Sequence, residues 1–84
     1  MSAVDGPLTF ATLKAHLPEM DRVAADGTLD LARCTRIDSA GAAYLIESSR
    51  RAKARGGSLN IVNANQQVKN LLHFFELDKV VALA

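Results

Sequence analysis

A capped helix between two strand-like segments constrains the fold of this chain more than any other feature. Asp38-Ser39 is a helix-starting signal, and Gly56-Gly57 marks the end of the helix after a run of basic residues. The positions expected to face the core recur at helical spacing, at Ala42, Leu45, Ile46 and Ser49. Apolar and polar residues alternate in the flanking segments 28–31 and 58–62, which predicts a strand on each side. This order predicts an α/β fold, in which a small mixed sheet of about four strands with some parallel pairing carries three to four helices.

Two further helices are predicted outside this central unit. Thr9 can cap the first of them, whose apolar positions are Phe10, Leu13, Leu17 and Met20. Because Pro18 has no N–H to donate, this helix should end or bend near Leu17. Loop residues 63–65 precede the other helix, in which we expect Phe74 to pack in the core beside a stripe formed by Val68, Leu71, Leu72 and Phe75. An apolar tail at 77–83 should return to the core.

The length and composition fit one globular domain, which we place at residues 1–84. Of the 84 residues, 49% are apolar and 23% are charged, a balance that argues against a disordered chain. The formal charge of +1 gives no reason to expect nucleic acid as a partner. With Cys34 as the one cysteine, no internal disulfide can form, which fits the cytoplasm. Since the N-terminus does not resemble a signal peptide and no apolar run approaches about 18 residues, we expect neither secretion nor membrane insertion.

No residue cluster points to catalysis. His16 and His73 fall on different predicted helices without further ligands nearby, so no metal site is expected and both should lie at the surface or its boundary. Cys34 would need a neighbouring base to act as a nucleophile, and a small buried side chain is the better interpretation. Gly56-Gly57 lacks the Gly-Lys-Ser/Thr ending of a phosphate-binding loop. We therefore expect a protein that is not an enzyme and needs no cofactor.

The segments Leu29-Asp30-Leu31, Ile37-Asp38-Ser39-Ala40-Gly41 and Leu59-Asn60-Ile61-Val62, in this order, resemble the STAS family, named for sulfate transporters and anti-sigma factor antagonists. The resemblance covers roughly residues 6 to 83 and implies the STAS fold. Residues 6–12, Gly-Pro-Leu-Thr-Phe-Ala-Thr, are further similar to the opening of the STAS subunits of Mla-type phospholipid ABC transporters. The resemblance thus implies a bacterial protein of the cytoplasm, held at the inner face of the membrane through its partner.

The chain departs from the family pattern at its first strand. STAS domains usually have one or two strands before the glycine that matches Gly6, and here five residues precede it. We therefore expect a first edge strand that is very short or missing. A bare sheet edge favours pairing with another chain, either in a homodimer or by the addition of a partner's strand.

The resemblance implies a partner-binding role for the start of the central helix, at Asp38, Ser39, Ala40 and Gly41. In the Mla-type subunits the residue matching Ser39 is a contact to the transporter ATPase. In anti-sigma factor antagonists the matching serine is phosphorylated by the partner kinase, which leaves Ser39 as the alternative phosphosite. From residue chemistry alone, the plainer interpretation is that one residue of Asp38-Ser39 caps the helix and the other is merely exposed.

The outer face of the central helix offers candidate extensions of this surface. If the stripe at Ala42, Leu45, Ile46 and Ser49 faces the sheet, the outward positions are Tyr44, Ser48, Arg51 and Arg55. Tyrosine and arginine are enriched at binding hot spots, so we assign Tyr44 and Arg51 to the partner surface. A competing interpretation is that Arg51 pairs with Glu47 one turn earlier.

Overall fold

Four strands and four α-helices make up the domain, of which the computed structural model describes residues 1–83. Their order along the chain, with two 3₁₀ turns labelled η, is β1 (Ser2–Ala3), α1 (Leu13–His16), η1 (Leu17–Glu19), α2 (Met20–Asp26), β2 (Thr28–Asp30), α3 (Ser39–Ala54), β3 (Asn60–Val62), α4 (Gln66–Phe74), η2 (Leu77–Lys79) and β4 (Ala82–Leu83). Within residues 1–83, no helix is long and apolar enough to cross a membrane.

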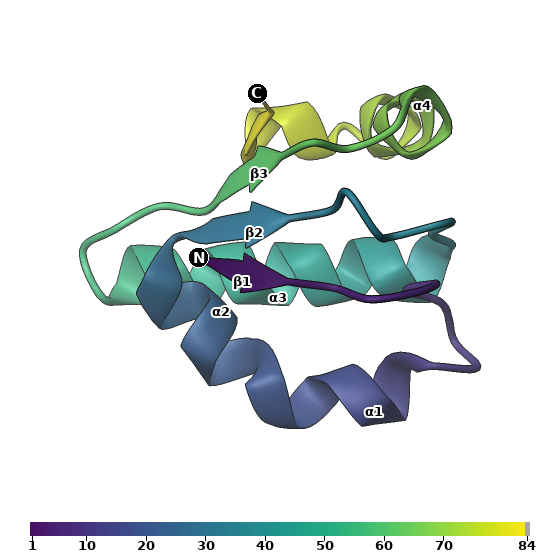
Figure 1. The fold of residues 1–84 in the computed structure, drawn as a ribbon. Helices are drawn as coiled ribbons and strands as arrows, with labels where there is room; N and C mark the ends of the chain where they lie inside the picture. Colours follow the sequence, from purple (N-terminus) through teal and green to yellow (C-terminus); the bar gives the residue numbers. More distant parts are fainter. Residues whose placement is uncertain (84) are drawn as a thin grey trace.

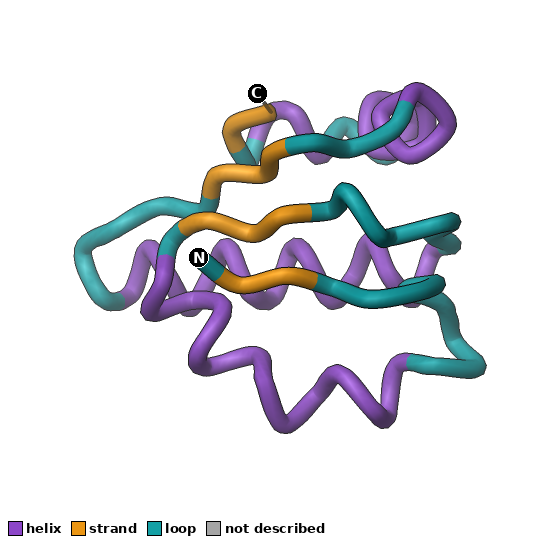
Figure 2. The backbone as a smooth tube through the Cα atoms, in the orientation of Figure 1, coloured by secondary structure: helices purple, strands orange, loops and turns teal. Residues whose placement is uncertain are grey.

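The strands form one sheet in the order β1-β2-β3-β4 (Figure 1). Each pairing between the described strands is parallel, where we had predicted a mixed sheet. In register, Leu29 of β2 lies between Ser2 of β1 and Ile61 of β3. The two edge strands β1 and β4 have two residues each, so the prediction of a very short first strand is confirmed (Figure 2).

Parallel pairing brings the carboxyl ends of the strands to one end of the sheet, which is also where α3 begins (Figure 1). The segment after β1 and the segment before α3 meet there in a parallel bridge between Leu8 and Ile37. Both side chains are buried. The topology therefore brings the loop after β1 against the N-terminus of α3.

Alternating burial fixes the faces of the strands as the sequence predicted. Leu29 and Leu31 are fully buried, whereas Asp30 between them is half-buried. Leu45 of α3 and Leu72 of α4 join them in one core. Removing a buried leucine of this kind typically costs about 2–5 kcal/mol, so this contiguous core is what makes so small a domain stable.

The first helix begins further along the chain than predicted, and it is divided into α1 and η1. The Thr9 N–H donates to the Thr12 hydroxyl over 3.0 Å, and that hydroxyl donates to the Pro7 carbonyl oxygen over 2.8 Å. These bonds hold residues 9–12 in a turn, so α1 begins at Leu13 and Phe10 is not on a helix. The expected break is confirmed, because α1 ends at His16 and Pro18 occupies the first turn of η1.

Helix α2 was not predicted, yet it contributes buried side chains from Met20, Val23 and Ala24. It packs against α3. Gly27 follows it with a positive φ of 75°, which turns the chain into β2.

The C-terminal part follows the prediction except at Phe74. Asn65 caps α4 by accepting a hydrogen bond of 2.8 Å from the Val68 N–H, and Leu77 and Val81 return to the core. Phe74, which we expected in the core, is 78% exposed, because the core-facing positions of α4 are taken by Val68 and Leu72.

Candidate functional site

Asp38 joins the N-terminus of α3 to the loop that follows β1. Its Oδ1 accepts hydrogen bonds from the N–H groups of Ala40 (2.9 Å) and Gly41 (3.1 Å). At the start of a helix such N–H groups have no acceptor within the helix itself. Its Oδ2 accepts a third bond, of 3.0 Å, from the N–H of Phe10. These backbone donors, led by Phe10 and assisted by the charge of Arg36, hold the pKa of the Asp38 carboxyl below its ordinary value. Asp38 is thus the cap and is ionised at neutral pH.

Two side chains beside this cap face solvent. Ser39 is exposed at the first position of α3, and Phe10 is 81% exposed. Sequence reasoning missed Phe10, because its spacing to Leu13 and Leu17 fitted the apolar face of a helix. The signal that could have identified it is the pair of threonines, Thr9 and Thr12, which can close a turn instead. An exposed aromatic residue, whose backbone N–H bonds to the cap, and an exposed serine, which follows the cap in sequence, therefore both adjoin Asp38 where α3 begins.

Gly41 has a packing role at this corner. A Cβ atom on Gly41 would collide with the backbone carbonyl oxygen of Leu8 and would lie 2.5 Å from Cγ1 of Ile37. Only glycine lets α3 approach the Leu8–Ile37 bridge this closely. Because Gly41 is buried and Ala40 is half-buried, of the four residues predicted at the helix start Ser39 alone is exposed.

The predicted outward placement of Tyr44 and Ser48 is wrong. Tyr44 is only 2% exposed, and its hydroxyl donates to the His16 carbonyl oxygen over 3.0 Å. Burial raises the pKa of the Tyr44 phenol. Ser48 is fully buried and donates to the Tyr44 carbonyl oxygen. Segment 13–26 covers this side of α3, so the Tyr44 side chain lies in the interior and not on the outer face where we had placed it.

Arg51 connects α3 to α2. Its Nε donates to Glu47 over 2.9 Å and its Nη1 donates to Asp21 over 2.8 Å. Glu47 also pairs with Arg50, and these two arginines, Arg50 foremost, lower the pKa of Glu47 to about 2. The competing interpretation of Arg51 as a partner of Glu47 is therefore correct, and a contact between Arg51 and a partner protein stays a prediction.

The cysteine and the histidines lie as predicted. Cys34 is buried, which raises its thiol pKa, and its Sγ donates to the Arg36 carbonyl oxygen. His16 is half-buried and His73 is exposed. Among residues 1–83, no group of three or more His, Cys, Asp or Glu side chains could hold a metal ion.

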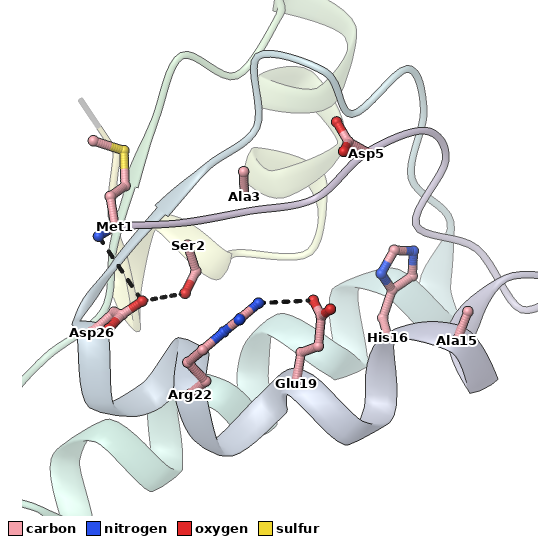
Figure 3. A pocket seen from close by; sticks show the side chains of 9 residues that line it. All are labelled: Met1, Ser2, Ala3, Asp5, Ala15, His16, Glu19, Arg22 and Asp26. Carbon is pink, nitrogen blue, oxygen red and sulfur yellow. Dashed lines mark hydrogen bonds and ion pairs between the residues drawn. The ribbon is translucent and has the colours of Figure 1, made fainter.

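A polar pocket of about 450 Å³ lies away from Ser39, between β1 and the segment His16–Asp26 (Figure 3). Several of its charged side chains are already paired. Asp26 accepts a hydrogen bond from the Ser2 hydroxyl and lies 4.0 Å from the N-terminal amine, while Arg22 pairs with Glu19 over 3.5 Å. These pairs are exposed or partly exposed and need no ligand to balance their charge.

A family model described as "Mlab, STAS domain" matches residues 3–83, nearly the whole chain. The chain belongs to the STAS family. A comparison of this STAS domain with curated proteins gives no match. The matched range includes Phe10, Asp38 and Ser39.

Solved structures of anti-sigma factor antagonists share the fold of this STAS domain. One, from Thermotoga maritima, has a TM-score of 0.80 at 20% sequence identity and covers 94% of this chain and 72% of its own. Another, the anti-sigma factor antagonist SpoIIAA in its unphosphorylated form, has a TM-score of 0.74 at 17% identity and covers 98% of this chain and 76% of its own. At such identities the likeness establishes the common fold.

Proposed function

We propose that this STAS domain is a non-catalytic subunit of an Mla-type phospholipid ABC transporter, which binds the transporter's ATPase subunit at the start of α3. The protein would act in the cytoplasm, at the inner face of the membrane, through this partner. The docking surface consists of Phe10 and Ser39, with Asp38 holding the loop of Phe10 against the helix.

The observation that carries the proposal is that Phe10 and Ser39, which both adjoin Asp38, are exposed. Aromatic residues are enriched at protein interfaces. Because Phe10 is 81% exposed, a partner that covers it removes a large apolar surface from water. The backbone N–H of Phe10 is tied to Asp38, which restrains the loop before any partner arrives. A restrained anchor loses less conformational entropy on binding. The family description, "Mlab, STAS domain", supports a transporter subunit as the class of protein.

A role for Ser39 in contact is better supported than a role in phosphorylation. A phosphate at a helix N-terminus is normally stabilised by free N–H groups. Here the N–H groups of Ala40 and Gly41 already donate to Asp38, whose carboxylate is itself negative and would repel the phosphate. Ser39 would therefore gain few of the usual stabilising contacts if it were phosphorylated.

The alternative function is that of an anti-sigma factor antagonist controlled by phosphorylation of Ser39. The structural likeness to two anti-sigma factor antagonists favours it. Incubation with ATP and the anti-sigma kinase of the same organism, followed by intact-mass analysis, tests this directly. One added phosphate that is lost in Ser39→Ala would support the alternative and contradict the transporter assignment.

Isothermal titration calorimetry with the ATPase subunit of the same transporter tests the primary proposal. We expect wild type to bind and Ser39→Arg to bind at least about tenfold more weakly, since a long cation would separate the two surfaces. Ser58→Arg is the matched control, because Ser58 is also exposed but precedes β3 at the opposite end of the sheet. Wild-type protein that does not bind the ATPase would overturn the proposal.

A further inference from the structure

The exposed face of α3 continues from Ser39 along the whole helix. Its outward residues alternate by four and three positions, at Ser39, Ala43, Ile46, Arg50 and Lys53, all of them exposed. This spacing places them in one stripe, and it is the spacing with which helices pack along each other. The stripe faces away from Tyr44 and therefore from the segment 13–26 that covers that side.

An apolar groove interrupts this stripe at Ile46. The groove has a volume of about 230 Å³ and is bounded by Ile46, Val80, Ser49, Arg50 and Lys53. Ser49 donates from its hydroxyl to the Val80 carbonyl oxygen over 2.8 Å, which fixes the C-terminal tail beside α3 and keeps the groove formed. We had predicted Ile46 in the core, but it is 45% exposed, because Leu45 and Ser49 occupy the sheet-facing side.

The charges around the groove are positive. Arg50 is compensated by Glu47 at 2.8 Å, whereas Lys53 forms no ion pair with the described residues 1–83. A cation in the last turn of a helix is favoured by the helix dipole, which accounts for the charge of Lys53. The dipole does not account for an exposed isoleucine and an exposed valine beside it. Apolar walls with a cationic rim are complementary to an apolar side chain that has a carboxylate next to it.

We infer that this groove is a second contact of the docking surface, filled by an apolar side chain from an acidic helix of the partner protein. The inference rests on the proposed function, since the partner is taken to be the ATPase subunit. Ile46 lies seven residues after Ser39, about 10 Å along the helix axis. One partner helix lying along α3 can therefore cover Ser39 and fill the groove at the same time.

Charge-introducing variants test the groove, with binding to the ATPase subunit measured by calorimetry. We expect Ile46→Glu to weaken binding at least about tenfold, because it places a carboxylate where an apolar group is buried. Leu17→Glu should bind like wild type: Leu17 is equally exposed, at 48%, but lies in η1, next to the His16 carbonyl that Tyr44 binds on the other side of α3. Lys53→Glu should weaken binding and reduce its dependence on salt. Circular dichroism and the melting temperature of each variant verify folding.

The outcomes separate this inference from the proposed function. Binding that is weakened by Ser39→Arg and unchanged by Ile46→Glu would overturn the groove contact and leave the proposed function intact. Wild type that does not bind the ATPase would overturn both. Sedimentation velocity of the protein alone adds one further result: a wild-type dimer that Ile46→Glu dissociates would mean that a second copy fills the groove, and would overturn the assignment to a partner.

Discussion

The carboxylate of Asp38 accepts a hydrogen bond of 3.0 Å from the backbone N–H of Phe10, which lies 28 residues earlier in the sequence. One oxygen of this carboxylate caps α3 and the other fixes the loop that carries the exposed ring. A single side chain therefore links the start of the helix to the candidate anchor. In this arrangement the cap predicted by sequence has a second purpose, which is to position Phe10.

Replacing Asp38 by alanine should impair both stability and binding. The variant loses the helix cap and frees the Phe10 loop, so we expect a lower melting temperature together with weaker binding to the ATPase subunit. Asn65→Ala removes the cap of α4 instead and should destabilise by about 1 kcal/mol with unchanged affinity. Calorimetric melting and binding titrations measure the two effects. Equal affinities for the two variants, once both are folded, would contradict a positioning role for Asp38.

Gly41→Ala should destabilise the protein, although alanine is the better helix former. The added Cβ would meet the backbone of Leu8 and the side chain of Ile37, which we expect to cost about 1–3 kcal/mol net of the gain in helix propensity. Gly57→Ala is the control, since its Cβ would lie at an ordinary 3.6 Å from the nearest atom. Urea unfolding of both variants gives the comparison. A Gly41→Ala protein as stable as wild type would show that α3 does not approach Leu8 so closely.

Tyr44→Phe should change stability and leave binding unaltered. The variant loses the hydrogen bond to the His16 carbonyl, which is worth about 0.5–1.5 kcal/mol. Because Tyr44 is buried, the affinity for the ATPase subunit should equal that of wild type. A variant that is fully stable and binds weakly would restore Tyr44 to the docking surface.

Helices α3 and α4 and strand β2 could be predicted from sequence because their determinants are local. The cap at Asp38, the cap at Asn65 and the strand alternation around Leu29 each lie within a few residues of the element that they define. Phe10 and Tyr44 were misplaced because their environments depend on distant contacts. Phe10 is fixed by a carboxylate 28 residues away, and Tyr44 is buried by the segment 13–26, of which α2 was not predicted. Alanines and serines on both faces of α3 also left its core-facing side ambiguous.

Acid should remove the stabilising effect of Glu47. Its hydrogen bonds to Arg50 and Arg51 lower its pKa from an ordinary 4.5 to about 2 in the folded protein. A carboxyl group with a depressed folded pKa stabilises fully above the unfolded value, and this stabilisation is lost as the pH falls toward the folded value. The difference in unfolding free energy between wild type and Glu47→Gln should therefore shrink as the pH falls from about 5 to about 2, the range that spans the unfolded and the folded pKa of Glu47. Urea unfolding across this range measures it, and a constant difference would contradict the depressed pKa.

Mapping the bound surface by NMR shows directly whether the ATPase subunit docks at the start of α3. Amide resonances of the ¹⁵N-labelled protein are recorded while the unlabelled ATPase subunit is added. We expect the resonances of Phe10, Ser39 and Ala43 to shift or broaden first, while those of β1 and α4 change little. Changes confined to β1 or α4, with Phe10 and Ser39 unaffected in a saturated complex, would contradict docking at the start of α3.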